Sequence, residues 1–238
     1  MSDNQKTRPR KKPNYNEDME REIEMILERK KSSDSGKKPS LLLHACCGPC
    51  SSAVLERLAE VFDITVFYYN PNIHPKAEYE RRLEELKKFL GVFPVSVENS
   101  VELVVSDYDV EDYFSATNVR NEPELQTERE KGERCRRCYE FRMRRAFGYA
   151  VDNGFDYFTT TLSISPHKDA DKINAIGRAL ERETVESEES GEPKKKTVFL
   201  PSDFKKKGGF LRSTQLSDEF GLWRQDYCGC VFSKENRS

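Results

Sequence analysis

The sequence predicts an α/β fold in which a parallel sheet is flanked by helices. The main observation is that short apolar segments, typical of buried strands, alternate with longer segments of helical periodicity. The length of 238 residues suits one large domain or two small ones, and such a chain needs no disulfide or metal for stability. Charged residues make up 34% of the chain, but 40 basic against 42 acidic residues leave a formal net charge of −2. A protein that binds polyanions over its whole surface is therefore disfavoured.

The first part of the predicted domain has the order strand, helix, strand, helix, strand. A buried strand is expected at 40–44, followed by a helix that Ser51 or Ser52 caps. The next strand is expected at 63–69. Pro75 then opens a second helix with apolar residues on one face, and Gly91 closes it before a strand-like segment at 92–97.

The second part adds further strand–helix steps. The polar stretch 101–133 is expected to hold helical pieces and loop. A helix from Tyr139 to about Gly154 precedes a strand at 155–161, and another helix is expected at 169–183. A charged loop at 186–196 then leads to a short strand at 198–200. In parallel sheets of this kind, the ligand site lies beyond the carboxyl ends of the strands.

The chain divides into two regions. Residues 1–38 are expected to form a flexible N-terminal arm with one short helix around Met19 and Ile26, disordered at 1–13. Residues 39–238 are expected to form a single α/β catalytic domain with a surface loop at 184–197. The apolar runs are too short for a membrane span and the N-terminus lacks a signal-peptide core, so we expect a cytoplasmic protein without membrane contact.

The seven cysteines stand in three groups, which carry the strongest functional signal. The groups are Cys46, Cys47 and Cys50, then Cys135 and Cys138, then Cys228 and Cys230. An odd number of cysteines in a reducing compartment argues against a disulfide framework. Such short spacings are more typical of metal ligands or redox groups than of packed core thiols. The first group directly follows the first strand, where the start of a helix lowers thiol pKa values.

The first group permits several kinds of site. Its position is that of a phosphate-binding loop, but neither the Walker pattern nor the loop of ATP pyrophosphatases is present, which disfavours ATP chemistry. The run Cys47-Gly48-Pro49-Cys50 matches the thioredoxin tetrapeptide and would suit a thiol–disulfide oxidoreductase, although Cys46 replaces the usual aromatic residue.

Two metal sites are also compatible with the cysteines. Cys46, Cys47, Cys135 and Cys138 could bind zinc in a tRNA-binding module, but adjacent cysteines fit zinc knuckles poorly. The same four thiols could hold an iron–sulfur cluster, whose ligands often come from distant segments. The one-residue spacing of Cys228 and Cys230 suits a redox-active disulfide better than metal ligation.

Longer motifs surround the cysteines. They read Leu41-Leu42-Leu43-His44-Ala45-Cys46-Cys47-Gly48-Pro49-Cys50, Tyr69-Asn70-Pro71-Asn72-Ile73-His74-Pro75, Cys135-Arg136-Arg137-Cys138-Tyr139, Ser163-Ile164-Ser165-Pro166-His167-Lys168-Asp169, Asp203-Phe204-Lys205-Lys206-Lys207-Gly208-Gly209-Phe210 and Tyr227-Cys228-Gly229-Cys230. With these motifs the sequence resembles the QueH-type epoxyqueuosine reductases, cobalamin-independent enzymes of queuosine synthesis in tRNA, from about Asn14 to the C-terminus.

The resemblance implies a reaction, a fold and a set of site residues. The reaction is reduction of epoxyqueuosine to queuosine at the tRNA wobble position, with loss of water. The fold is similar to that of adenine-nucleotide α-hydrolases of the PP-loop-like class, with an added cysteine-bearing helical segment. The family pattern implies that Cys46, Cys47, Cys135 and Cys138 hold a [4Fe–4S] cluster and that Cys228 and Cys230 form the redox-active pair. It also implies one additional iron ion, for which Cys50 is either a ligand or a thiol without a role.

Further expectations concern protons, electrons and RNA. The electrons are expected from an unidentified donor, and the protein is expected to be a monomer that binds tRNA carrying epoxyqueuosine. The candidate proton donors are His44, His74, His167, Lys168 and Asp169. The candidate phosphate contacts are Arg134, Arg136, Arg137, Arg142, Arg144, Arg145 and Lys205 to Lys207, and the candidate stacking residues are Tyr68, Tyr69, Phe210 and Tyr227.

Overall fold

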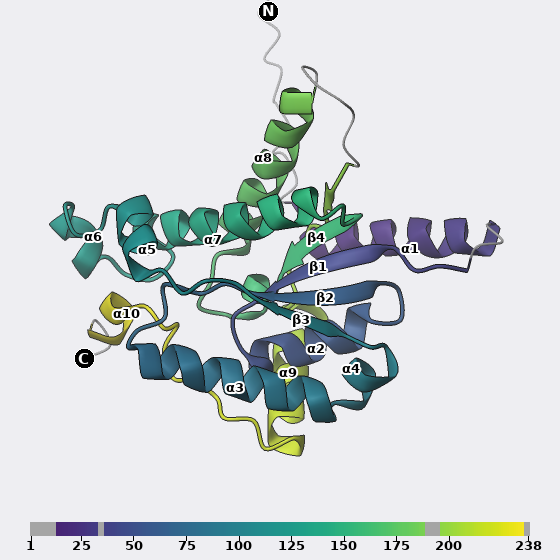
Figure 1. Cartoon of the computed structure of the whole chain (residues 1–238), viewed down its shortest axis with the longest axis horizontal. Coiled ribbons are helices and arrows are strands. Elements are labelled where there is room, and N and C mark those ends of the chain that lie inside the picture. The colour runs from purple at the N-terminus through teal and green to yellow at the C-terminus, as the bar shows by residue number, and fades with distance from the viewer. Residues whose placement is uncertain (1–12, 33–35, 189–195, 236–238) are drawn as a thin grey trace, which may run out of the picture.

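The computed structural model describes residues 13–32, 36–188 and 196–235 (Figure 1). One sheet of five parallel strands has the order β3-β2-β1-β4-β5. The strands are β1 (Ser40–Ala45), β2 (Asp63–Tyr68), β3 (Glu102–Val105), β4 (Tyr157–Thr160) and β5 (Val198–Phe199). The predicted parallel α/β fold is confirmed.

Helices make up most of the rest of the described chain. The α-helices are α1 (Tyr15–Ser32), α2 (Gly48–Leu58), α3 (Lys76–Val92), α4 (Pro94–Glu98), α5 (Val110–Thr117), α6 (Pro123–Thr127), α7 (Glu133–Asp152), α8 (Ala170–Glu188), α9 (Gly209–Glu219) and α10 (Val231–Glu235). Two short 3-10 helices are η1 (Thr161–Ile164) and η2 (Lys206–Gly208). None of the helices in the described ranges has the length and apolar character required to cross a membrane.

The central strand β1 is buried on both faces of the sheet. Leu41 and Leu43 point into a core shared with α2 and α3, whereas Leu42 points into a second core formed with α7 and α8. Alternation along a strand produces this division, because successive side chains lie on opposite faces. In Figure 1, α7 and α8 cover one face of the sheet, and α2, α3 and α9 cover the other.

The strand order creates a crevice at the carboxyl end of β1. From β1 the chain passes to β2 and β3 on one side, whereas β4 and β5 lie on the other side. The connections that leave β1 and β4 therefore run in opposite directions, and such a switch point is where parallel sheets bind ligands. The first cysteine group follows β1, and residues 161–169 follow β4.

The predicted strand at 92–97 is wrong. Helix α3 extends through Val92, and α4 occupies Pro94–Glu98. Pro94 lies in the first turn of α4, where its missing N–H is tolerated, whereas it would interrupt a strand ladder. The rings of Phe89 and Phe93 stack at 4.7 Å in the core. The third strand is instead β3, within the polar stretch that was expected to hold helical pieces and loop.

Two other predicted boundaries also need correction. Cys47, rather than Ser51 or Ser52, is the N-cap of α2, and its sulfur accepts a hydrogen bond from the N–H of Cys50. Helix α8 continues to Glu188, so the first residues of the predicted surface loop at 184–197 are helical. Residues 189–195 of that loop lie outside the described residues.

Helix α1 packs tightly against the sheet domain. Met19 is fully buried in the core beside α2, and the Arg57 guanidinium donates hydrogen bonds of 2.9 Å to Asn16 and Glu20. Residues 15–32 are therefore part of the packed structure and not a loose arm, although the predicted helix itself is confirmed. The expected disorder at 1–13 falls almost entirely outside the described residues.

We predict that Met19→Ala lowers the free energy of unfolding by about 2–5 kcal/mol, because it leaves a cavity in the core. Met25→Ala is the matched control, since Met25 lies on the same helix and is 41% exposed. Urea unfolding followed by circular dichroism measures both values. Equal unfolding midpoints for the two variants would contradict the packing of α1 described above.

Candidate metal and redox site

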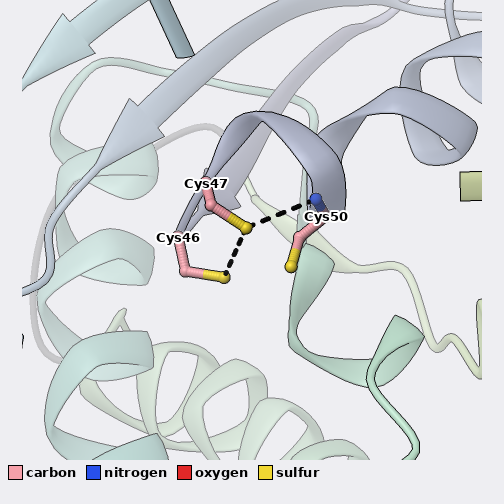
Figure 2. A group of neighbouring side chains, drawn as sticks. All are labelled: Cys46, Cys47 and Cys50. Carbon is pink, nitrogen blue, oxygen red and sulfur yellow. Dashed lines mark hydrogen bonds between the residues drawn. The ribbon is translucent and has the colours of Figure 1, made fainter. Parts of the chain in front are cut away.

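Three sulfur atoms meet in the turn that connects β1 to α2. Cys46 and Cys47 follow the strand directly, and Cys50 lies in the first turn of the helix. The sulfurs of Cys46 and Cys47 are 3.8 Å apart, and the Cys50 N–H donates to the Cys47 sulfur at 3.3 Å. All three sulfurs lie within 4.8 Å of one another, as Figure 2 shows. The turn thus presents a compact set of soft donors.

Of the three thiols, only Cys46 is favoured as a thiolate. Hydrogen bonds from Cys47 and Cys50 hold the pKa of Cys46 well below its ordinary value. Burial, followed by the hydrogen bonds and charges of the other two sulfurs, raises the pKa of Cys47. The hydrogen bond to Cys46 raises the pKa of Cys50 to about 12. Metal binding would release the remaining protons, and thiolate sets of this kind prefer zinc, copper(I) or iron–sulfur clusters.

The second cysteine pair lies at the start of α7. Cys135 and Cys138 are three residues apart, so they share one face of the helix. They border a small cavity together with Cys228 and Cys230. A second cavity, of about 280 Å³, borders Cys50 and Cys228, and both cavities share Glu130, His167 and Lys168. All three cysteine groups therefore lie at the same end of the sheet.

A buried hydrogen-bond chain connects the first two groups. The Asn70 amide donates to the carbonyl of Ala45 at 2.9 Å, directly before Cys46. The Arg142 guanidinium donates to the Asn70 oxygen at 3.1 Å and to the Cys138 carbonyl at 3.4 Å. Both side chains are almost fully buried. The end of β1 is thereby fixed relative to the first turns of α7.

The third cysteine group lies in a turn that α3 holds in place. Arg82, which is buried beside Glu78, donates to the carbonyls of Tyr227 and Cys228 at 3.1 and 3.2 Å. Gly229 has φ +103°, and a Cβ at this position would lie 2.7 Å from the Ile73 side chain. Only glycine suits both conditions, which explains the residue between the two cysteines. Cys228 and Cys230 are free thiols in this structure, so the expected disulfide is absent.

Gln225 is a site residue that sequence reasoning missed. Its amide N–H donates to the sulfur of Cys47 at 3.1 Å and lies 3.8 Å from that of Cys50. Its oxygen is buried and has no hydrogen-bond partner among the described residues. Gln225 therefore connects the segment of the third cysteine group to the first. The only signal for it in the sequence is its position shortly before Cys228.

The candidate proton donors separate into two sets. His44 is fully buried within the sheet, bonded to Thr160 and to the Tyr69 carbonyl, and burial lowers its pKa to about 3. Its neutral imidazole therefore links β1 to Thr160 of β4 and to Tyr69, which follows β2. Asp169 caps α8 by accepting the N–H groups of Asp171 and Lys172.

His167 and Lys168 border both cavities. Burial alone would lower the pKa of Lys168, but the charges of Cys46, Cys50 and Cys228 outweigh it and raise the pKa. The half-buried Lys168 is therefore a cation facing the thiols. His74 stands apart from these cavities, with its ring near Phe114.

The arginines of α7 are already engaged within the protein. Arg134 and Arg142 are buried. The others with partners are Arg136, bound to Glu133 and Glu140; Arg137, bound to Glu122 and Glu133; and Arg144, bound to Glu140 and Glu183. The predicted phosphate-binding cluster beside Cys138 is mostly a set of internal contacts, with Arg145 as an exposed exception.

Comparison with known proteins gives the family of this chain. The family model described as "Epoxyqueuosine reductase QueH" matches residues 41–236. The chain belongs to the QueH family. A QueH from Streptococcus pyogenes serotype M1 is 40% identical over 196 residues, which cover 82% of this chain and 71% of that protein. A QueH from Thermotoga maritima is 34% identical over 82% of this chain and 90% of that protein. The sequence-based assignment to these oxidoreductases is confirmed.

Among solved structures, one match is the "U34-tRNA thiolase NcsA from Methanococcus maripaludis with its [4Fe-4S] cluster". It is 13% identical with a TM-score of 0.44, and covers 92% of this chain and 71% of that chain. A similarity of this level says nothing about the cofactor or substrate of the present QueH protein.

The thiols of the third group should differ strongly in reactivity. A hydrogen bond from Cys230 lowers the pKa of Cys228 to about 5, whereas that of Cys230 is raised. Alkylation of Cys228 in the metal-free, reduced protein should therefore rise with pH up to about 6 and be flat above it, because the thiolate is then fully formed. Mass spectrometry of the labelled peptide measures the rate.

Removing the Cys230 thiol tests whether its hydrogen bond lowers the pKa of Cys228. Cys230→Ala should move the midpoint of the Cys228 profile upward, whereas Cys230→Ser, which keeps a hydroxyl donor, should move it less. A Cys228 rate that still rises steeply between pH 7 and 9 in the unmutated protein would contradict the described contact.

Proposed function

We propose that this QueH protein reduces epoxyqueuosine to queuosine at the wobble position of tRNA, the last step of queuosine synthesis. The observation that carries the proposal is the convergence of three cysteine segments at the carboxyl end of β1, in a chain of this family. The reaction removes the epoxide oxygen as water and leaves an alkene, so it consumes two electrons and two protons.

The donor set fits an iron–sulfur cluster. Cys46, Cys47, Cys135 and Cys138 would hold a [4Fe–4S] cluster, because four thiols from two fixed segments provide the required ligands. Cys50, whose sulfur lies beside those of Cys46 and Cys47, would be available to one additional iron ion. Such groups supply one-electron transfer and Lewis acidity when bound.

The pair of Cys228 and Cys230 matches the electron balance. The low pKa of Cys228 keeps its sulfur as a thiolate. Oxidation of the pair to a disulfide therefore breaks the S–H bond of Cys230, forms one S–S bond and releases two electrons and one proton. One epoxide consumes these two electrons, this proton and one further proton. An external electron donor must then restore the dithiol before the next turnover.

Lys168 is positioned to handle the leaving oxygen. Lys168 borders the cavity of Cys50 and Cys228, and the raised pKa keeps its amine protonated near neutral pH. It can donate a hydrogen bond to the negative oxygen that forms when a C–O bond breaks, and then a proton. His167 is the neighbouring second donor.

The test is anaerobic incubation of reconstituted protein with tRNA carrying epoxyqueuosine and a strong one-electron reductant, followed by nucleoside mass spectrometry. We expect queuosine. Cys228→Ser should form at most about one product per protein molecule, and Lys168→Met should lower the rate by about 10²–10⁴-fold.

Return of epoxyqueuosine alone from wild-type protein that is fully loaded with iron and sulfide would contradict the proposed reaction. Full multiple turnover by Cys228→Ser with every reductant would contradict the role of the dithiol. A colourless protein that retains zinc instead of iron would favour the zinc-bound tRNA-binding module, because zinc has no redox chemistry.

A further inference from the structure

The structure distinguishes one of the four aromatic residues that could stack on RNA bases. Tyr68, Tyr69 and Tyr227 are buried, and the hydroxyls of Tyr68 and Tyr227 donate to the carbonyls of Tyr79 and His74. Phe210 is 37% exposed at the start of α9. Its exposed ring contributes less to the core than the buried rings do.

Phe210 lines the cavity that also borders Cys50 and Cys228. This cavity of about 280 Å³ also borders Pro49, Cys50, Arg224 and Cys228. Its volume is close to the lower end, about 300 Å³, of pockets that hold small molecules. A planar group resting on Phe210 would thus lie in the cavity that Cys50 and Cys228 border.

A basic side chain lies beside this ring. The Arg224 guanidinium lies 5.5 Å from the ring centre and is fixed by hydrogen bonds to the Ser213 carbonyl and the Ser217 hydroxyl. Lys205 and Lys207, which precede α9, are paired with Asp203 and Glu20, whereas Lys206 is exposed. An aromatic ring with a basic side chain beside it is a feature of proteins that bind single-stranded nucleic acid.

The backbone holds Phe210 in place. A Cβ on Gly209 would lie 1.9 Å from the carbonyl oxygen of Phe204, so the chain enters α9 in close contact with a buried residue. Helix α9 in turn packs against α2, the helix that begins at the first cysteine group. The ring is therefore presented from a rigid element.

We propose that Phe210 is the stacking platform for a nucleobase of the RNA substrate, with Arg224 beside it, at the entrance to the cavity of Cys50 and Cys228. The inference rests on the proposed function, which places a base of an unpaired anticodon loop at these thiols. Bases in RNA loops are commonly recognised by stacking on aromatic side chains. The stacking orients the base and leaves its other face and its edges to the cavity wall.

A protein partner is the competing occupant of this surface. Leu211 is 62% exposed next to Phe210, and two apolar side chains could form a docking patch. The cavity favours the nucleobase, because it is lined by Phe210 and reaches the thiols, whereas Leu211 does not line it. Leu211 therefore serves as the matched control.

The test measures binding of reconstituted full-length protein to fluorescently labelled tRNA carrying epoxyqueuosine, by fluorescence anisotropy at fixed salt. Phe210→Ala should raise the Kd by about 5–150-fold, the effect of losing one stacked base. Phe210→Trp should keep the affinity and Leu211→Ala should leave it unchanged. In Phe210→Trp, tRNA should also quench the added tryptophan fluorescence relative to the wild type, which contains only Trp223.

The outcomes distinguish failure of the stacking platform from failure of the proposed function. Wild-type binding that Phe210→Ala retains would overturn the platform alone, as would an unquenched tryptophan at position 210. Equal weakening by Phe210→Ala and Leu211→Ala would indicate a general apolar patch and also overturn it. Absence of tRNA binding by the wild type would overturn both the platform and the proposed function.

Discussion

The hydrogen bonds of Asn70 and Arg142 are the constraint on which the site depends. The parallel sheet alone positions the end of β1, but it does not fix the position of α7, which begins far along the chain. Asn70 satisfies the last carbonyl of β1, and Arg142 connects that amide to the carbonyl of Cys138. A buried guanidinium without hydrogen-bond partners is costly. The arrangement is therefore stable only when α7 lies where Arg142 can reach Asn70 at the end of β1. Two cysteine segments are thereby held in one place.

Positive charge is also concentrated around the thiols. Arg142 and Lys168 both interact with the charges of Cys46 and Cys228, and Arg82 interacts with that of Cys47. Thiolates, not thiols, bind metals and exchange electrons. These cations compensate for thiolate charge that burial alone would disfavour. Arg82 has a second effect, because it also holds the turn of Cys228 and Cys230.

The sequence predicted those parts of the molecule that depend on local pattern. Strands β1, β2, β4 and β5 were predictable because apolar residues buried on both faces leave a continuous signal. The segment 92–97 has the same composition but packs as helix, through contacts of Phe89, Phe93 and Phe220 that only the tertiary structure defines. The short spacing of the cysteines, which is also a local pattern, indicated metal or redox chemistry.

The relation between the cysteine groups was not predictable in this way. It depends on Asn70, Arg82 and Gln225, polar residues whose partners lie far away in the chain. The arginines of α7 were equally unpredictable in their partners. As a run of basic residues they indicate an RNA-binding face, and the structure adds that Glu122 and Glu183, from other segments, pair with two of them. Charge patterns along a helix do not reveal such partners.

The most direct measurement of the central claim is the iron and sulfide content of Cys138→Ser after anaerobic reconstitution, with Cys228→Ser prepared in parallel. If the segments of β1 and α7 share one cluster, Cys138→Ser should lose the iron, the sulfide and the visible absorption of the wild type. Cys228→Ser should keep all three, since its sulfur is assigned to the proposed redox pair and not to the cluster. Full iron and sulfide in Cys138→Ser would show that the two segments do not form a single metal centre, and would contradict the account.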